Sequence, residues 1–297
     1  MIDLVLIGLI EAAPLVLAAI GFTLIYYLNG FINVAYAETM TSGAYFAVLL
    51  NVTLGLNFYV AILPAAVMAG LLSVATYLCV FRPAQRRGVG QVEMIVLSVG
   101  LSFLLRHTLR VVFGVELYLF DLRDPSYFSI LGTGVTSAQL WALALVAVMV
   151  TGAYLMTYRS RYGQMMRALA NNRDLAVASG IDPTKASVLV WFVAGVAGGL
   201  AGIFIGVFSF VDYQLGWNLV LVVVMVAIVG GIGNVRGALV AGAAAGVVTA
   251  LLTRLTEPLY AQVLLLALFI LVLRVKGSRR AGPSRTTSGL RALVGRG

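Results

Sequence analysis

Residues 158–185 read YRSRYGQMMRALANNRDLAVASGIDPTK and form the longest polar interruption in a sequence that otherwise consists of one apolar segment after another. When the stretch is arranged as a helix, one side carries the polar residues Gln164, Arg167, Asn171 and Asp174. The opposite side carries the apolar residues Met165, Met166, Leu169, Ala170, Ala176 and Val177. The pattern predicts a short amphipathic helix.

A stop signal follows this helix at Gly180 and Pro183. Glycine accepts the left-handed conformation of a helix cap, and proline cannot continue a helix. A helix with this pattern is also typical of a segment that lies in the lipid headgroup layer. From the residues alone, the segment is either such an interfacial helix or a surface that a partner contacts.

The composition is that of a polytopic membrane protein. Of the 297 residues, 61% are hydrophobic and 10% are charged, and the mean hydropathy is +1.02, whereas about 25% of a soluble domain is charged. One membrane-spanning helix needs about 20 apolar residues. Eight or nine spans would use most of the chain and leave no room for an ATPase domain. The long apolar runs lack the alternation of barrel strands, so an all-α bundle is expected.

Nine apolar segments are expected to span the membrane: 4–28, 33–51, 57–81, 92–113, 138–158, 185–211, 215–233, 237–253 and 258–274. With the N-terminus outside, the cytoplasmic loops receive Arg82, Arg86, Arg87, Arg159, Arg161, Arg167, Arg173, Lys185, Arg236 and the tail. The outer loops receive only Arg123 and Arg254. This distribution follows the positive-inside rule and supports nine spans.

Residues 1–274 are therefore expected to form one transmembrane domain, with a polar cytoplasmic loop at 159–185. The basic tail 275–297 is expected to be disordered and cytoplasmic. The outer loop 114–137 is long and acidic, which fits a solvated loop or a docking surface. Basic residues are absent before Arg82, so a secretory signal peptide is not expected. The single cysteine, Cys79, is expected to be a buried packing residue.

A polar stretch within the second apolar segment, NGFINVAYAETMTSGAY at 29–45, contains Asn33, Tyr36, Glu38, Thr41 and Tyr45. A carboxylate at membrane depth costs several kcal/mol unless it faces a cavity or a partner. Glu38 is therefore a candidate for the solute pathway, with a structural role in an irregular helix as the alternative. We expect Asn33 and Tyr36 to line or border the same route.

Two glycine-rich segments are expected to serve helix packing. Gly195, Gly199 and Gly202 form small-xxx-small spacings that let two helices approach closely. The second segment, AIVGGIGNVRGALVAG, predicts a re-entry or a tight turn between helices and contains Gly230, Gly231, Gly233 and Gly237.

Other polar residues in the apolar segments carry weaker signals. Arg106 and Arg110 lie one turn apart near the outer end of segment 92–113, which favours snorkelling to the headgroups. His107 is the only histidine, so no metal site is expected. Glu11 lies near the outer end of the first segment. Phosphate loops, GxSxG and HExxH motifs are absent from the sequence, which predicts no catalytic site and no enzyme activity on this chain.

Three motifs give the chain a resemblance to the membrane permeases of branched-chain amino-acid ABC importers over nearly its full length. NGFINVAYAETMTSGAY resembles the family's N-F-A-H-G-E run, which ends in G-[AS]-Y. GQMMRALANNRDLAVASGI resembles the family's cytoplasmic G-x-x-x-R-A-x-A loop through Gly163, Arg167, Ala168, Ala170 and Gly180. GGIGNVRGALVAG resembles G-G-x-G-[ST]-x-x-G-A.

The resemblance implies a type II-like ABC importer permease in the inner membrane of a prokaryote. It implies as partners a second permease or a second copy, two cytoplasmic ATPase subunits that hold ATP and Mg²⁺, and an extracytoplasmic solute-binding protein. The stretch from Gly163 to Gly180 would be the coupling helix, with Gly163, Arg167, Ala168, Asn171, Asp174 and Gly180 as its contact residues.

Two departures from the family pattern bear on the solute. Tyr36 and Ala37 stand where the family usually has His-Gly, and Asn234 replaces Ser or Thr. The resemblance thus implies a branched-chain amino acid or a similar small polar molecule as the solute, because the family also looks to include carriers of amides, urea and small carboxylates. An ion-driven secondary carrier is the main alternative, and an intramembrane enzyme is a weaker one, because a nucleophile with a base is missing.

Overall fold

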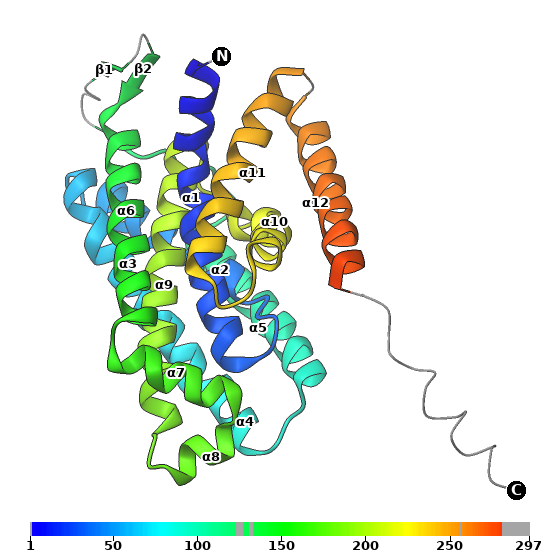
Figure 1. The fold of residues 1–297 in the computed structure, drawn as a ribbon. Coiled ribbons are helices and arrows are strands. Elements are labelled where there is room, and N and C mark those ends of the chain that lie inside the picture. Colours follow the sequence, from blue (N-terminus) through cyan, green and yellow to red (C-terminus); the bar gives the residue numbers. More distant parts are fainter. Residues whose placement is uncertain (1, 123–126, 131–132, 256, 281–297) are drawn as a thin grey trace, which may run out of the picture.

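The computed structural model describes residues 2–122, 127–130, 133–255 and 257–280, and these are almost entirely helical (Figure 1). In chain order the helices are α1 (Ile2–Asn29), α2 (Tyr36–Val48), α3 (Phe58–Thr76), α4 (Arg82–Arg86), α5 (Gln91–Phe113), α6 (Ser137–Tyr158), α7 (Arg161–Asn171), α8 (Arg173–Ala178), α9 (Pro183–Phe208), α10 (Leu215–Gly230), α11 (Val235–Leu255) and α12 (Pro258–Arg280). Single π-helical turns, Leu49–Thr53 and Tyr77–Phe81, extend α2 and α3.

Each of the nine predicted apolar segments coincides with a helix of this bundle. Six helical stretches among the described residues are long and apolar enough to cross a membrane, and they contain α1, α3, α5, α6, α9 and α11. Two shorter apolar helices are α10 and the Tyr260–Arg274 part of α12. The ninth segment is α2, whose side chains are almost all buried. The predicted all-α, multi-span fold is therefore confirmed.

The centre of the bundle is formed by α1 and α9, which pack against α2, α3 and α11 (Figure 1). Glycine makes these contacts close. A Cβ atom on Gly199 would lie 2.5 Å from the Cβ of Ala69 on α3, and one on Gly195 would lie 2.5 Å from the Cβ of Ser73. A Cβ on Gly202 would collide with the carbonyl of Met40 on α2. Small residues thus allow three helices to meet at backbone distance.

The turn between α10 and α11 shows how the second glycine segment is used. Gly231 and Gly233 have φ values of +94° and +76°, which favour glycine. Asn234 caps α11 because its Oδ1 accepts a hydrogen bond from the Gly237 amide at 3.1 Å. Gly230 and Gly237 approach each other so closely that neither has room for a side chain. The segment forms a tight turn between two helices, one of the two predicted outcomes.

The described residues of the predicted outer loop 114–137 include two short strands. Strands β1 (Tyr127–Ile130) and β2 (Thr133–Thr136) pair antiparallel, with Tyr127 opposite Thr136. The Asn51 side chain donates to the Asp121 carbonyl at 3.1 Å and accepts from the Asp121 amide at 2.9 Å. These bonds hold the start of the loop against the bundle. The predicted outer residues 123–126 lie outside the described residues.

Two further expectations are changed by the structure. Cys79 is exposed, so the prediction of a buried packing residue was wrong. The π-helical turn Tyr77–Phe81 buries Tyr77 and Phe81 instead, which leaves the cysteine on the outer side of the helix. Helix α12 continues to Arg280, beyond the expected start of the tail at residue 275. The remainder of the predicted tail, 281–297, lies outside the described residues.

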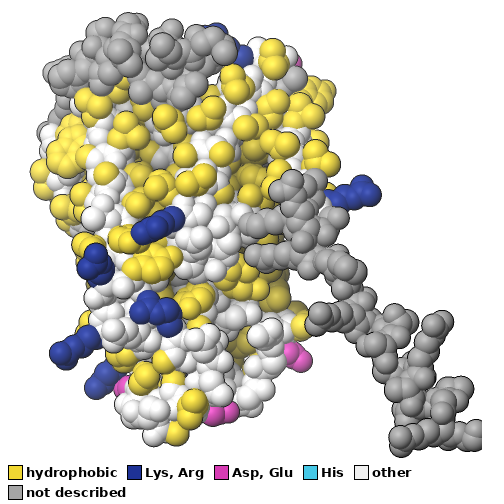
Figure 2. Space-filling model, in the orientation of Figure 1, with side chains coloured by type: hydrophobic (Ala, Val, Ile, Leu, Met, Phe, Trp, Pro, Cys, Tyr) yellow, Lys and Arg dark blue, Asp and Glu magenta, His cyan; other side chains and the backbone are white. Residues whose placement is uncertain are grey.

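The polar and apolar surfaces are separated along the bundle. Helices α4, α7 and α8 lie at the end opposite the start of α1 (Figure 1). On the face shown in Figure 2, most Lys and Arg side chains gather over the half that contains α7 and α8, and hydrophobic side chains cover the rest. Among the basic residues predicted for the cytoplasmic side, those of α4, α7 and α8 thus lie at one end of the molecule.

Candidate functional site

A buried ion pair joins α2 to α5 inside the bundle. The Glu38 Oε1 atom accepts hydrogen bonds from Arg106 Nη2 at 2.8 Å and from Arg106 Nε at 3.1 Å. The Ser102 hydroxyl donates to the same oxygen at 2.9 Å. Glu38 is fully buried, and Arg106 is only 6% exposed. Both charges therefore leave water together, and each depends on the other for its stability.

The other side of the Arg106 guanidinium faces aromatic rings. Its Cζ atom lies 3.9 Å from the ring centre of Trp217 on α10 and 5.4 Å from that of Phe103. A cation over an aromatic face is attracted by the ring quadrupole. The prediction that Arg106 snorkels to the headgroups was wrong, because a buried carboxylate and an indole ring hold it inside the protein.

The sequence contained a signal for this cluster that the prediction missed. Ser98, Ser102 and Arg106 recur every four residues, so they share one face of α5. All three are buried, and the Ser98 hydroxyl accepts a hydrogen bond from the Val34 amide at 3.1 Å. The polar stripe of α5 thus lies on the polar start of α2.

The remaining pathway candidates are packed by neighbouring helices. The Tyr36 hydroxyl donates to the Ala194 carbonyl of α9 at 3.2 Å. Thr41 accepts from the Gly216 amide at 3.0 Å, which ties α2 to α10. Tyr45 stacks on Phe113, with ring centres 4.4 Å apart. Asn33 is 2% exposed.

Three buried polar atoms of this segment have no hydrogen-bond partner among the described residues: Asn33 Oδ1, Glu38 Oε2 and Tyr45 Oη. An unpaired buried polar atom costs free energy, and such atoms often mark a site completed by a ligand, water or a partner. Of the three atoms, Glu38 Oε2 is the strongest candidate for contact with a ligand, because it belongs to a charged group.

The segment 158–185 forms two helices, where the sequence predicted one. Asn172 interrupts the predicted helix with an extended backbone, φ −154° and ψ 104°, and its side chain caps α8 by accepting from the Leu175 amide at 3.0 Å. Gly180 ends α8 with φ +85°, as predicted. Pro183 then begins α9 in the first turn, where its missing N–H is harmless.

Helix α7 is fixed to the bundle. Arg167 donates to the Thr157 carbonyl at the end of α6. Gly163 lies against the same carbonyl, and a Cβ there would collide with it. Met166 and Leu169 are buried, whereas Ala168 is half-buried and Gln164 is exposed. Most of the apolar side of α7 is therefore covered by this chain, although Ala170 is exposed.

Helix α8 differs from α7, because its two large apolar side chains are exposed. Leu175 is 66% exposed and Val177 is 49% exposed, while only Ala176 is buried. Asn171 and Asp174 are exposed around them. Val177, which the sequence places on the apolar side of the segment, is therefore not covered by this chain.

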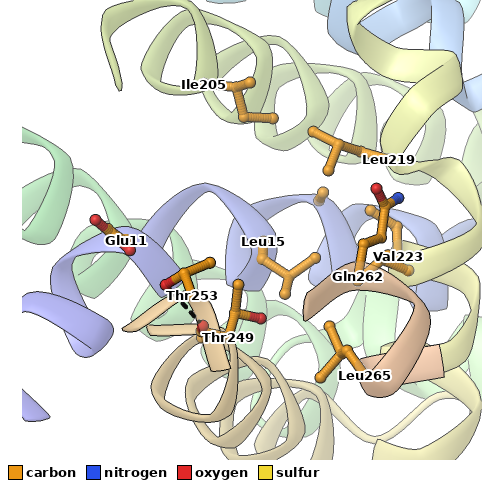
Figure 3. Close-up of a pocket in the computed structure, with 12 residues that line it drawn as sticks. Glu11, Leu15, Ile205, Leu219, Val223, Thr249, Thr253, Gln262 and Leu265 are labelled. Carbon is orange, nitrogen blue, oxygen red and sulfur yellow. Dashed lines mark hydrogen bonds between the residues drawn. The ribbon is translucent and has the colours of Figure 1, made fainter. Parts of the chain in front are cut away.

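A cavity of about 260 Å³ lies elsewhere, between α1, α9, α10, α11 and α12 (Figure 3). Its walls include Leu15, Ile205, Leu219, Val223 and Leu265, and its polar lining residues are Glu11, Thr249, Thr253 and Gln262. None of the predicted pathway residues lines it. Groups of three or more potential metal ligands do not occur within the described part of the chain.

The sequence matches a family model along most of its length. Residues 4–273 match the family described as branched-chain amino acid transport system, permease component. The chain belongs to this family. Membership in the branched-chain permease family supports the ABC permease over the ion-driven carrier, and it fits the type II-like importer fold. The chain is a multi-span member of a transport-permease family.

Two curated relatives of this permease carry related names. The chain is 26% identical over 205 residues to a probable branched-chain amino acid transport permease protein LivH of Methanocaldococcus jannaschii. This alignment covers 65% of this permease and 63% of the relative. The chain is 25% identical over 201 residues to the high-affinity branched-chain amino acid transport system permease protein BraD of Pseudomonas aeruginosa. This alignment covers 64% of this permease and 65% of the relative. The match thus spans slightly less than two thirds of each relative.

A solved structure has a similar fold. PsaBC from Streptococcus pneumoniae, determined in complex with a Fab, aligns with a TM-score of 0.51 at 14% identity. The alignment covers 90% of this permease and 89% of the other chain. At this identity the likeness concerns the fold alone.

Proposed function

We propose that this chain is the permease subunit of an ATP-driven ABC importer for branched-chain amino acids or a similar small polar solute. It works with a second permease or a second copy of itself, two cytoplasmic ATPases that bind ATP and Mg²⁺, and an extracytoplasmic solute-binding protein. The chain itself is not an enzyme. It resides in the inner membrane of a prokaryote, with α7 and α8 on the cytoplasmic side and the N-terminus outside.

The observation that carries the proposal is the contrast between α7 and α8. Helix α7 is fixed to α6 through Arg167 and Gly163, so it transmits force to the bundle. Helix α8 presents exposed Leu175 and Val177 at the basic end of the molecule. A short helix with free apolar side chains on a rigid support suits insertion into a groove of a partner. Together the two helices fit the coupling element between an ATPase and a permease.

The solute route is proposed to run beside the Glu38–Arg106 pair. A buried pair of opposite charges offers complementary partners to a solute that carries both an ammonium and a carboxylate group. The Oε2 atom of Glu38 and the Oδ1 atom of Asn33 are buried acceptors without a hydrogen-bond partner among the described residues. Tyr36, Thr41 and Tyr45 flank this region and fix α2 against α9, α10 and α5.

The proposal is tested by gentle affinity purification of the full chain from its native membrane, followed by identification of its partners. We expect a P-loop ATPase, a permease and, after addition of the binding protein, stimulated ATP hydrolysis. In proteoliposomes, solute uptake should require ATP inside and persist when a proton uncoupler is added at constant ATP. Uptake that stops with the uncoupler, in a chain that purifies alone, would establish the ion-driven carrier instead.

A paired substitution tests the coupling role of α7. Arg167→Glu combined with Asn171→Ala should abolish ATP-dependent uptake, because it removes the anchor to α6 and an exposed polar contact. The matched control is Arg254→Glu, a charge reversal at an exposed position near the opposite end of the bundle. Unchanged uptake in the double variant would contradict the coupling assignment.

A further inference from the structure

The cavity between α1 and α9–α12 has an uneven distribution of polar groups. Figure 3 shows Glu11, Thr249 and Thr253 together at one end, with Gln262 on the opposite side and aliphatic side chains between them. Glu11 is exposed, so this end forms the mouth of the cavity. The walls between the polar ends consist of Leu15, Ile205, Leu219, Val222, Val223 and Leu265. The cavity is thus an aliphatic chamber with a polar mouth.

The polar groups at the mouth can only accept hydrogen bonds. The Thr249 hydroxyl donates its proton to the Ala245 carbonyl at 2.8 Å. The Thr253 hydroxyl donates to the Thr249 carbonyl at 3.0 Å and to the Ala250 carbonyl at 3.2 Å. An ionised carboxylate such as that of Glu11 has no proton to donate. The lone pairs of all three side chains remain available, and no Lys or Arg is among the lining residues.

We propose that this cavity binds a ligand with a primary ammonium group on an aliphatic chain. The ammonium group offers three N–H donors, which match the Glu11 carboxylate and the two threonine oxygens. The chain of the ligand fills the chamber between Leu15, Val223 and Leu265. This site is separate from the Glu38–Arg106 region and does not depend on the proposed function.

The same chemistry excludes a free amino acid from the mouth. The carboxylate of a zwitterion would lie next to its own ammonium group, where it would face Glu11 and two hydroxyls that have already given their protons. Like charges at this distance repel each other, and a carboxylate without donors loses its hydration. The cavity volume of about 260 Å³ is also below the roughly 300–1,000 Å³ of sites for drug-sized molecules, so the bound chain is short or belongs to one end of a lipid.

Two sources supply this chemistry. One is a soluble alkylamine, and the other is a single-chain amine dissolved in the membrane, whose polar end carries no phosphate beside the ammonium group. Both place an ammonium group at Glu11 and an aliphatic chain in the chamber. A choline headgroup does not fit, because its quaternary nitrogen has no N–H to donate.

The test uses the full chain in nanodiscs of phosphatidylcholine and equilibrium dialysis with labelled hexylamine, hexanol and hexanoate. We expect saturable binding of hexylamine and binding about tenfold weaker or worse for the other two, because a charge-assisted hydrogen bond contributes more than a neutral one. Glu11→Gln should weaken hexylamine binding about tenfold. Leu219→Phe should also reduce it by filling the chamber. Glu116→Gln, an exposed acid in the loop after α5, is the matched control and should bind like wild type.

Phosphatidylcholine nanodiscs that also contain octadecylamine separate the two sources. Competition with hexylamine in these discs would assign the site to a lipid amine, and undiminished binding would assign it to a soluble amine. The proposal is overturned if hexylamine does not bind in phosphatidylcholine discs, if hexanol binds as tightly, or if Glu11→Gln binds like wild type. Since the readout is binding to this chain alone, none of these outcomes depends on ATPase partners or on transport.

Discussion

The two polar stretches of this permease, 29–45 and 158–185, interrupt the same kind of apolar sequence, but the structure treats them in opposite ways. The first is buried, and it pairs Glu38 with Arg106 inside the bundle. The second lies at one end of the molecule, where it exposes Leu175 and Val177. In the first region polar groups are placed in an apolar environment, and in the second region apolar groups are placed in a polar one.

The two regions differ in the process that satisfies their side chains: folding of the chain for the first region, and binding of a partner for the second. Burial of Glu38 and Arg106 is tolerated only because the two opposite charges are paired with each other inside the chain. Exposure of Leu175 and Val177 leaves apolar area that a partner can cover, at about 25 cal/mol per Å² of surface removed from water. The buried stretch thus fixes the permease itself, and the exposed stretch is available for assembly.

The largest effect is expected from breaking the buried pair. Arg106→Leu should lower the free energy of unfolding by about 3–5 kcal/mol, since it leaves the Glu38 charge buried without a counterion. The measurement is unfolding of the purified chain in a mild detergent. The double variant Glu38→Gln with Arg106→Leu should recover most of the stability, because no lone charge remains.

Transport by the same double variant sharpens the comparison. If the pair borders the solute route, the double variant should remain folded and associate with the ATPases while its ATP-dependent uptake is lost. Wild-type uptake by that variant would mean that the pair is structural only. A double variant as unstable as Arg106→Leu alone would contradict the account of the pairing.

A smaller effect is expected where the buried stretch meets α9. Gly202→Ala should destabilise the chain by about 1–3 kcal/mol, because the added Cβ collides with the Met40 carbonyl. The matched control is Gly152→Ala in α6, where a Cβ meets no atom within 4 Å. The control should be neutral or slightly stabilising, since alanine favours helix over glycine. Equal melting temperatures for the two variants would show that the close contact does not limit packing.

In the exposed stretch, Gly180→Ala should cost about 1–2 kcal/mol, because alanine is strained at φ +85° while no neighbouring atom is within 4 Å. Gly180→Asn should cost less, since asparagine tolerates the left-handed region better. Unfolding in detergent measures both variants. The expected result is a larger loss of stability for Gly180→Ala than for Gly180→Asn. The reverse order would mean that the backbone at residue 180 can change its conformation freely.

The smallest effect on stability is expected for Leu175→Glu, within about 0.5 kcal/mol of wild type, because this side chain is mostly exposed. Its effect on assembly should be large, with loss of the ATPase from affinity-purified complexes. Leu119→Glu, an exposed leucine in the loop after α5, is the control and should keep the ATPase. Full ATPase recovery with Leu175→Glu would favour a helix that lies in the headgroup layer.

The apolar architecture could be predicted from the sequence because it depends on local properties. Segment length and hydropathy located all nine helical segments, and the glycine pairs indicated the turn after Gly230. The Glu38–Arg106 pair could not be predicted in this way, since it depends on how α2 and α5 lie side by side. Periodicity showed that Arg106 shares a face with Ser102, but it did not show which helix that face meets.

The break in the coupling segment was missed for a different reason. Asn172 is a good capping residue, and Asp174 in the next turn favours a helix start. A period of 3.6 residues continues across the break, so amphipathicity alone favours one helix. The exposure of Leu175 and Val177 follows from the direction of α8, which only the structure provides.

The contact of α1 with α11 also affects how the protein is made. Gly246 of α11 packs on Ala12 of α1, and Gly242 packs on Val16. Because α11 begins at Val235, α1 enters the membrane on the order of 10–50 s before its main neighbour is synthesised, at roughly 5–20 residues per second. During this interval the surface that later faces α11 contacts lipid or the insertion machinery. Helix α1 therefore completes its packing only after most of the other helices have been synthesised.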